Sequence, residues 1–186
     1  MQKILIGFSF FLITITVNAQ RTISSEEGFT PQVGVLVSML NDLSNRVERT
    51  VKDLNTEEID FLLDENANSI GTLIMHLAAT EKLYQVYTFE NRELNEEEEE
   101  EWNTAMSMGK EAQKKFKGKE VQEYLEVFEA VRAKTLEYLK NKDDQWLAQN
   151  TSDDNMNHYW AWFHVMEHQS SHLGQILLLK KRIPND

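Results

Sequence analysis

The sequence contains no cysteine among its 186 residues. This absence excludes a disulfide framework, a thiolate-bound zinc site and a cysteine nucleophile. It also excludes a membrane anchor formed by a lipid attached to cysteine. Any metal site in this chain must therefore be built from imidazole, carboxylate or water.

Basic residues are few: 19 lysines and arginines stand against 31 aspartates and glutamates, and the formal net charge is −12. Such an acidic chain repels nucleic acid and anionic lipid, so neither is an expected partner. Hydrophobic residues still make up 41% of the chain, which is enough for the buried core of one domain. We expect a small-molecule substrate, whose identity the sequence does not give.

The N-terminus has the pattern of a secretory signal peptide. Lys3 supplies the positive start, and the apolar run 4–17 is shorter than the ~20 residues that a membrane span needs. Val17-Asn18-Ala19 resembles a small-residue cleavage site. We predict a signal peptide over 1–19 and an exported, periplasmic or extracellular chain, one charge unit more negative because Lys3 is removed. The alternative is a retained N-terminal anchor.

Only two prolines and seven glycines interrupt the chain, and long stretches follow the helical period. Thr30 followed by Pro31 is typical of a helix start. Apolar residues three and four apart predict four helices, over 33–54, 69–89, 120–141 and about 155–183. Either Asn68 or Ser69 can cap the second of them. We predict an all-α four-helix bundle over 33–183, preceded by a lead segment over 20–32.

Helical periodicity fails between residues 91 and 119. This stretch includes six consecutive glutamates, 96–101. We interpret them as a solvated helix end or loop, because consecutive carboxylates on a helix point in different directions. An acidic lip that collects cations is the alternative.

The histidines are the strongest chemical signal. The chain has five, and four of them lie in the last predicted helix: His158, His164, His168 and His172. Histidines four residues apart lie on one helix face, about 6 Å apart along the axis. His164 and His172 are about 12 Å apart by the same rise, too far to share one ion. Spacing therefore leaves two pairs open, His164/His168 and His168/His172.

A histidine pair needs a third ligand from another element to form a metal site. His76 is the histidine outside the last helix, and it falls on the inward stripe of the second. Inward positions on facing helices are where bundles build metal sites. The alternative for His76 is an ordinary core histidine.

Two motifs resemble the DinB-like superfamily, which is unrelated to the DNA polymerase of that name. The first is Asn68-Ser69-Ile70-Gly71 followed by Leu73 and His76. The second is the run from His168 to Ile176, an HxxxH pair followed by Gly174-Gln175. The resemblance covers about residues 33–183 and departs from the family at Leu173, where a basic residue is common. The predicted signal peptide is also atypical.

This resemblance implies an up-down-down-up bundle in which His76, His168 and His172 bind one divalent metal ion. Zinc or nickel is the expected ion, with manganese or iron as alternatives, since imidazole suits several metals. His164 then becomes a neighbour of the site or a core residue. Glu167 and Gln175 are candidates for orienting a ligand imidazole. Trp160, Tyr159 and Trp162 form either core or the wall of an apolar cleft.

Three imidazoles leave a coordination position open, which favours catalysis over a structural role. The resemblance implies a metal-dependent enzyme, either a thiol S-transferase or a small hydrolase. Export weakens the thiol version, because such thiols are concentrated in the cytoplasm. The alternatives are a non-catalytic metal-binding or stress-related module and a bundle that has lost its metal. Pairing of two copies through exposed helix faces is a further expectation.

Overall fold

The computed structural model describes residues 22–184. The predicted signal peptide over 1–19 lies outside these residues. The described part is helical and contains no β-strand, which confirms the predicted all-α class. Its helices are α1 (Pro31–Val51), α2 (Thr56–Ile59), α3 (Ile70–Phe89), α4 (Glu96–Ser107), α5 (Gly109–Lys115), α6 (Val121–Leu139), α7 (Asp144–Ala148) and α8 (His158–Lys180). None of these helices combines the length and apolarity needed to cross a bilayer.

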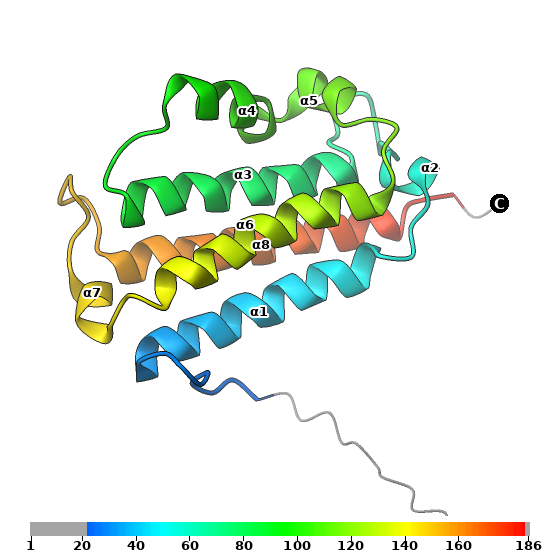
Figure 1. The fold of residues 1–186 in the computed structure, drawn as a ribbon. Coiled ribbons are helices and arrows are strands. Elements are labelled where there is room, and N and C mark those ends of the chain that lie inside the picture. Colours follow the sequence, from blue (N-terminus) through cyan, green and yellow to red (C-terminus); the bar gives the residue numbers. More distant parts are fainter. Residues whose placement is uncertain (1–21, 185–186) are drawn as a thin grey trace, which may run out of the picture.

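The four long helices α1, α3, α6 and α8 lie side by side and form the body of the molecule (Figure 1). Helix α3 packs against α6 and α8, and α1 packs against the same two helices. The chain runs through α1 and α8 in one direction and through α3 and α6 in the other (Figure 1). This arrangement fits the predicted up-down-down-up order.

Helix α1 begins where Thr30 and Pro31 predict, but its cap comes from elsewhere in the chain. Thr30 has the extended backbone of an N-cap, yet its side chain makes no capping hydrogen bond. Asp144 of α7 accepts instead, from the backbone N–H of Gln32 at 2.9 Å and of Val33 at 3.2 Å. A carboxylate at a helix N-terminus also interacts favourably with the helix dipole. The contact fastens α7 to the start of α1.

The glutamate run begins a helix, so its interpretation as a loop is wrong and its interpretation as a helix end is correct. Asn95 and Glu98 form a capping box, with Glu98 N–H donating to Asn95 Oδ1 at 3.0 Å. Glutamates in the first turn are stabilised by the helix dipole. Only Trp102 and Ala105 of α4 are buried. Because the buried face is so narrow, apolar periodicity gives little sign of this helix.

The start of α3 explains the first sequence motif. Ser69, rather than Asn68, caps the helix by accepting the N–H of Thr72 at 3.1 Å. Asn68 instead accepts the N–H of Gly109 at 2.9 Å and so ties α3 to the α4–α5 junction. A Cβ at Gly71 would lie 2.7 Å from the ring of Tyr124. The glycine therefore allows α3 to approach α6 closely.

Two apolar clusters fill the bundle, and buried polar side chains of α3, α6 and α8 lie between them. The larger cluster joins the end of α1, the first halves of α3 and α6, and the second half of α8. The smaller joins the start of α1, the end of α6, α7 and the start of α8. The polar side chains at mid-height, which we call the polar layer, are Glu81, Gln85, Arg132, Thr135 and Gln169.

Arg132 of α6 is the centre of the polar layer. Its Nε and Nη2 atoms donate to the two carboxylate oxygens of Glu81 on α3, both at 2.7 Å. Nη2 also donates to Gln169 Oε1 of α8 at 3.1 Å. Nη1 donates to the carbonyl oxygen of Leu40 and, at 2.6 Å, to Ser44 Oγ, both on α1. One guanidinium therefore contacts all three of the other long helices.

Replacing Arg132 tests how strongly the fold depends on this contact. Arg132→Met should lower the free energy of unfolding by about 3–5 kcal/mol, because Glu81 would remain buried without its cation. The matched control is Lys134→Met on the same helix, which removes an exposed ion pair with Glu137 and should cost less than about 1 kcal/mol. Urea unfolding followed by circular dichroism measures both. Equal effects of the two substitutions would contradict this account.

Candidate metal centre

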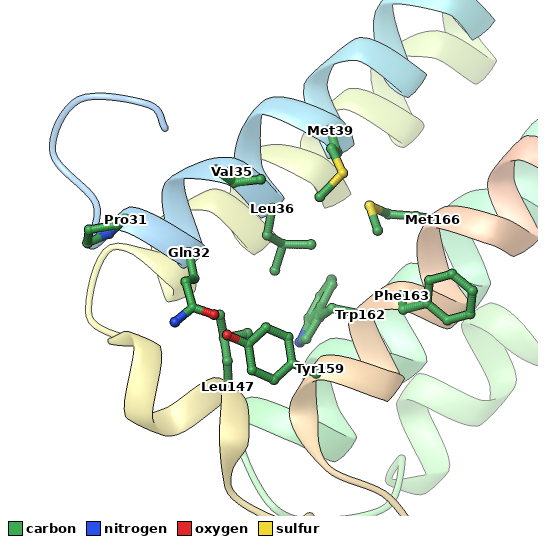
Figure 2. Close-up of a pocket in the computed structure, with 10 residues that line it drawn as sticks. All are labelled: Pro31, Gln32, Val35, Leu36, Met39, Leu147, Tyr159, Trp162, Phe163 and Met166. Carbon is green, nitrogen blue, oxygen red and sulfur yellow. The ribbon is translucent and has the colours of Figure 1, made fainter. Parts of the chain in front are cut away.

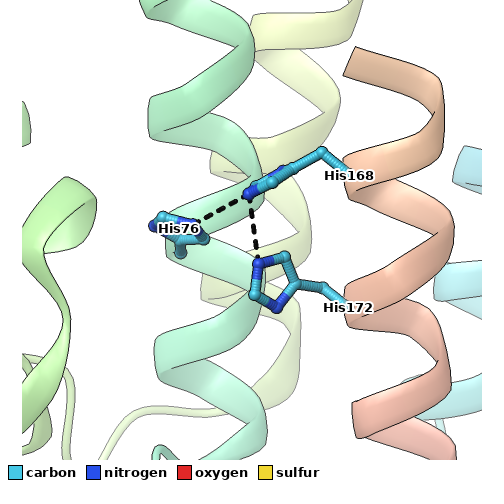
Figure 3. A group of neighbouring side chains, drawn as sticks. All are labelled: His76, His168 and His172. Carbon is cyan, nitrogen blue, oxygen red and sulfur yellow. Dashed lines mark hydrogen bonds between the residues drawn. The ribbon is translucent and has the colours of Figure 1, made fainter. Parts of the chain in front are cut away.

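Helices α3 and α8 bring three imidazole rings to one point. His76 Nε2 lies 3.1 Å from His168 Nε2, and His172 Nε2 lies 3.1 Å from the same atom. Figure 3 shows His76 reaching from α3 and the other two from successive turns of α8. Among the described residues, these three histidines form the group of side chains that could hold a metal ion. Their ligand atoms all lie within 4.8 Å of one another.

The backbone of α4 orients His76. Its Nδ1 lies 2.9 Å from the carbonyl oxygen of Ala105. A carbonyl can only accept a hydrogen bond, so Nδ1 carries the proton of the neutral ring and Nε2 presents its lone pair. His76 is only 7% exposed. This contact was not expected from the sequence, since any residue type offers a backbone carbonyl and α4 itself was not predicted.

Gln175 orients His172 in the same way. The side-chain oxygen of Gln175 lies 2.9 Å from His172 Nδ1, one helical turn further along α8. The Nδ1 proton is again used, and Nε2 is left as an acceptor. The structure therefore places Gln175 where the sequence predicted an orienting partner. His172 is 9% exposed.

The converging lone pairs are arranged as they would be around a cation. With Nδ1 protonated on His76 and His172, two acceptors face His168 Nε2, and one proton on that atom can satisfy only one of them. Metal–nitrogen bonds of about 2.0–2.1 Å in a tetrahedron place two ligand nitrogens roughly 3.3 Å apart. The two separations of 3.1 Å are close to this value. The geometry is therefore compatible with a bound divalent metal ion.

The electrostatics keep the rings of His76 and His168 neutral, which is the form that binds metal. Burial, together with the positive charges that His172, His76 and His164 would carry, lowers the pKa of His168 to about 4. Burial also lowers the pKa of His76, more than the hydrogen bond to Ala105 raises it. At neutral pH both rings thus have their lone pairs available.

His164 lies next to this cluster and outside it. Its ring centroid is 5.9 Å from that of His168, whereas the His168 and His172 rings are 4.4 Å apart. His164 Nδ1 lies 3.1 Å from a carboxylate oxygen of Glu167. Glu167 therefore partners His164, and its predicted role beside a ligand imidazole is not what the structure shows.

The aromatic residues of α8 divide between core and surface. Trp162 is fully buried, whereas Tyr159 is 37% and Trp160 48% exposed. Tyr159 and Trp162 line an apolar pocket of about 380 Å³ between α1, α7 and α8 (Figure 2). None of the three clustered histidines lines this pocket. The predicted apolar cleft thus exists, but away from the histidine cluster.

Comparison with known proteins agrees with this fold. A solved structure described as a conserved protein of locus from Enterococcus faecalis superimposes with a TM-score of 0.62 over 79% of this chain and 94% of that one. The two sequences are 16% identical, so this likeness concerns the fold. No curated protein matches the chain.

Helical architecture and motifs together define a DinB-like protein. Within that superfamily, the family model described as mycothiol-S-transferase matches residues 35–184. The chain belongs to this family.

The titration of His168 tests the electrostatic account in protein freed of metal by a chelator. Its ring-proton NMR signal should titrate with a midpoint of about 4, well below the ordinary value of 6.5. The unfolded chain takes up this proton near pH 6.5 and the folded chain near 4. The residue's contribution to stability is therefore complete above pH 6.5 and is lost as the pH falls towards 4.

The matching stability measurement compares wild type with His168→Gln. The substitution should flatten the fall in unfolding free energy between pH 6.5 and 4, since the residue whose pKa differs between the two states is gone. A His168 midpoint near 6.5, with the same pH dependence in both proteins, would show that burial does not act on this ring.

Proposed function

We propose that the chain is a metal-dependent S-transferase, which joins the sulfur of a low-molecular-weight thiol to an electrophilic carbon of a second substrate. The proposal rests on the convergence of three Nε2 atoms within 4.8 Å of one another. Membership of the mycothiol-S-transferase family supports the transferase class. The three ligands are His76, His168 and His172, and zinc or nickel is the proposed ion.

A bound divalent ion would lower the pKa of a thiol and so keep its sulfur nucleophilic near neutral pH. The chain's own contribution is orientation. Ala105 and Gln175 fix the rings of His76 and His172 with their Nε2 atoms directed at the shared point. Partners of this kind typically change metal affinity by about 10–100-fold. Because His76 and His172 are buried while His168 is partly exposed, substrates approach from the side of His168.

A small hydrolase would use the same open coordination position to activate water. The family match favours the thiol reaction. A non-catalytic metal-binding module and a bundle without metal are the remaining alternatives. Metal content distinguishes a bundle without metal from the three metal-binding alternatives. Activity measured with and without thiol then distinguishes the S-transferase, the hydrolase and the non-catalytic module.

Metal analysis of the purified protein is the first test. Elemental analysis should find about one equivalent of a divalent metal in wild type and under about a tenth in His168→Ala, because two imidazoles make only a partial site. His164→Ala is the matched control, on the same helix face one turn away, and should keep its metal. Equal metal content in the two variants would refute the ligand assignment.

Activity is then measured with mycothiol and monochlorobimane, which becomes fluorescent when a sulfur–carbon bond replaces its carbon–chlorine bond. We expect turnover that depends on both metal and thiol and falls at least about 100-fold in His168→Ala. His164→Ala again serves as the control. Hydrolysis of an ester probe without thiol, combined with no thiol transfer, would favour the hydrolase instead.

We also propose that the chain is exported after cleavage behind Ala19. Expressed with its full N-terminus in a bacterial host, the protein should appear outside the cytoplasm with an intact mass that begins at Gln20. The chain after cleavage would then meet only thiols present in that compartment. A protein that keeps residues 1–19 and stays in the cytoplasm would refute export and leave the S-transferase proposal intact.

A further inference from the structure

A row of aromatic rings leads away from the histidine cluster along α8. Trp160, His164, His168 and His172 follow one another at intervals of four, so their side chains share one helix face. Successive ring centroids are 5.2, 5.9 and 4.4 Å apart. The metal ligands are thus one end of a longer row, and Trp160 is the other.

Packing in the core does not explain why the indole of Trp160 is exposed. The indole is 48% exposed, whereas Trp162 on the same helix is fully buried and Trp102 is 7% exposed. Its ring lies nearly parallel to that of His164, at an angle of 6°. A large aromatic ring that is stacked on one side and open to solvent can take a second planar group.

Other contacts hold the middle of the row in place. His164 Nδ1 lies 3.1 Å from Glu167, which restrains the rotation of the imidazole. Tyr84 of α3 approaches the same ring with a centroid separation of 5.7 Å. The row therefore has side chains from both α3 and α8, the two helices that carry the histidine cluster.

Space for a ligand exists at the Trp160 end. A cavity of about 300 Å³ is lined by Trp160 and by Asn155, Met156 and Asn157 just before α8. This volume is at the lower end of the ~300–1,000 Å³ typical of small-molecule sites, and it suits one substituted aromatic ring. The backbone N–H of Trp160 donates a hydrogen bond to the side-chain oxygen of Asn157 at 2.9 Å. This contact fixes the cavity wall to the start of α8.

We propose that this row binds the acceptor substrate, and that the acceptor carries a planar aromatic group. The aromatic group stacks on Trp160, and the rest of the molecule extends past His164 to place its reactive carbon at His168. The acceptor is uncharged or cationic, because Glu167 borders the row and the chain carries a net charge of −12. This inference builds on the proposed S-transferase function and adds the class of its second substrate.

The test measures binding of 4-nitrobenzyl alcohol, an unreactive planar probe, to the metal-loaded protein by titration of the probe's proton NMR signals. Cyclohexylmethanol is the saturated comparison. We expect the planar probe to bind wild type at least about tenfold more tightly, as stacking on an aromatic ring allows. In wild type, the indole N–H signal of Trp160 should move with the same titration curve.

Matched variants separate stacking from general apolar contact. Trp160→Leu should lose about tenfold in affinity for the planar probe, whereas Trp160→Phe should lose less than about threefold because a planar ring remains. Phe163→Leu is the control: Phe163 is 55% exposed on the same helix but lines the other pocket (Figure 2), so binding should not change. Equal affinity in wild type and Trp160→Leu, or equal binding of the two probes, would overturn the proposal.

The same titration in His168→Ala distinguishes this proposal from the proposed function. Stacking on Trp160 needs no metal, so the planar probe should still bind within about threefold of wild type. If metal binding fails in wild type while Trp160 still responds to the probe, the S-transferase proposal fails and the aromatic site stands. If metal and thiol transfer are found but Trp160 does not respond, only the aromatic site is refuted.

Discussion

The contact between Arg132 and Glu81 is the interaction on which the rest of the bundle depends. The apolar clusters above and below it specify the rotation of the helices less strictly, because the hydrophobic effect is non-directional. A guanidinium that must satisfy a carboxylate on α3, a carbonyl and a hydroxyl on α1, and an amide on α8 permits one arrangement. We interpret the polar layer as a device that selects register, a role attested for buried polar groups in other bundles.

This selection affects the histidine cluster through neighbouring positions in the chain. Gln169, the α8 partner of Arg132, directly follows His168, and Glu81 lies five residues after His76. When the polar layer fixes the rotation of α3 and α8, it also fixes the direction in which both helices point their histidines. Ala105 and Gln175 then restrain the rotation of the His76 and His172 rings. The geometry of the cluster therefore follows from helix placement first and ring orientation second.

The features that the sequence could predict are those that depend on residues close together in the chain. The four long helices and the HxxxH spacing depend on residues near one another in the chain, and both were predictable. The choice of His172 over His164 was not, because spacing alone treats the two pairs alike and only the resemblance separated them. Helix α4 was missed because it buries just Trp102 and Ala105. The Ala105 contact was missed for a second reason, since it comes from the backbone. From the sequence, Glu167 could contact His164 or a ligand histidine. In the structure its side chain adopts a rotamer that contacts His164.

The histidine cluster brings ring nitrogens together in an unfavourable contact. Three rings face one another, burial lowers the pKa of two of them, His76 and His168, and converging lone pairs repel as long as nothing positive lies between them. A cation at that point converts this unfavourable contact into three bonds, so the folded chain binds it far better than the unfolded chain does. By linkage, the same ion must then stabilise the fold. The polar layer makes this possible, because a bundle free to rotate α8 would relieve the repulsion by turning the histidines apart. The contacts of Arg132 with α8 and any affinity of the cluster for a cation would therefore depend on the same fixed rotation of α8.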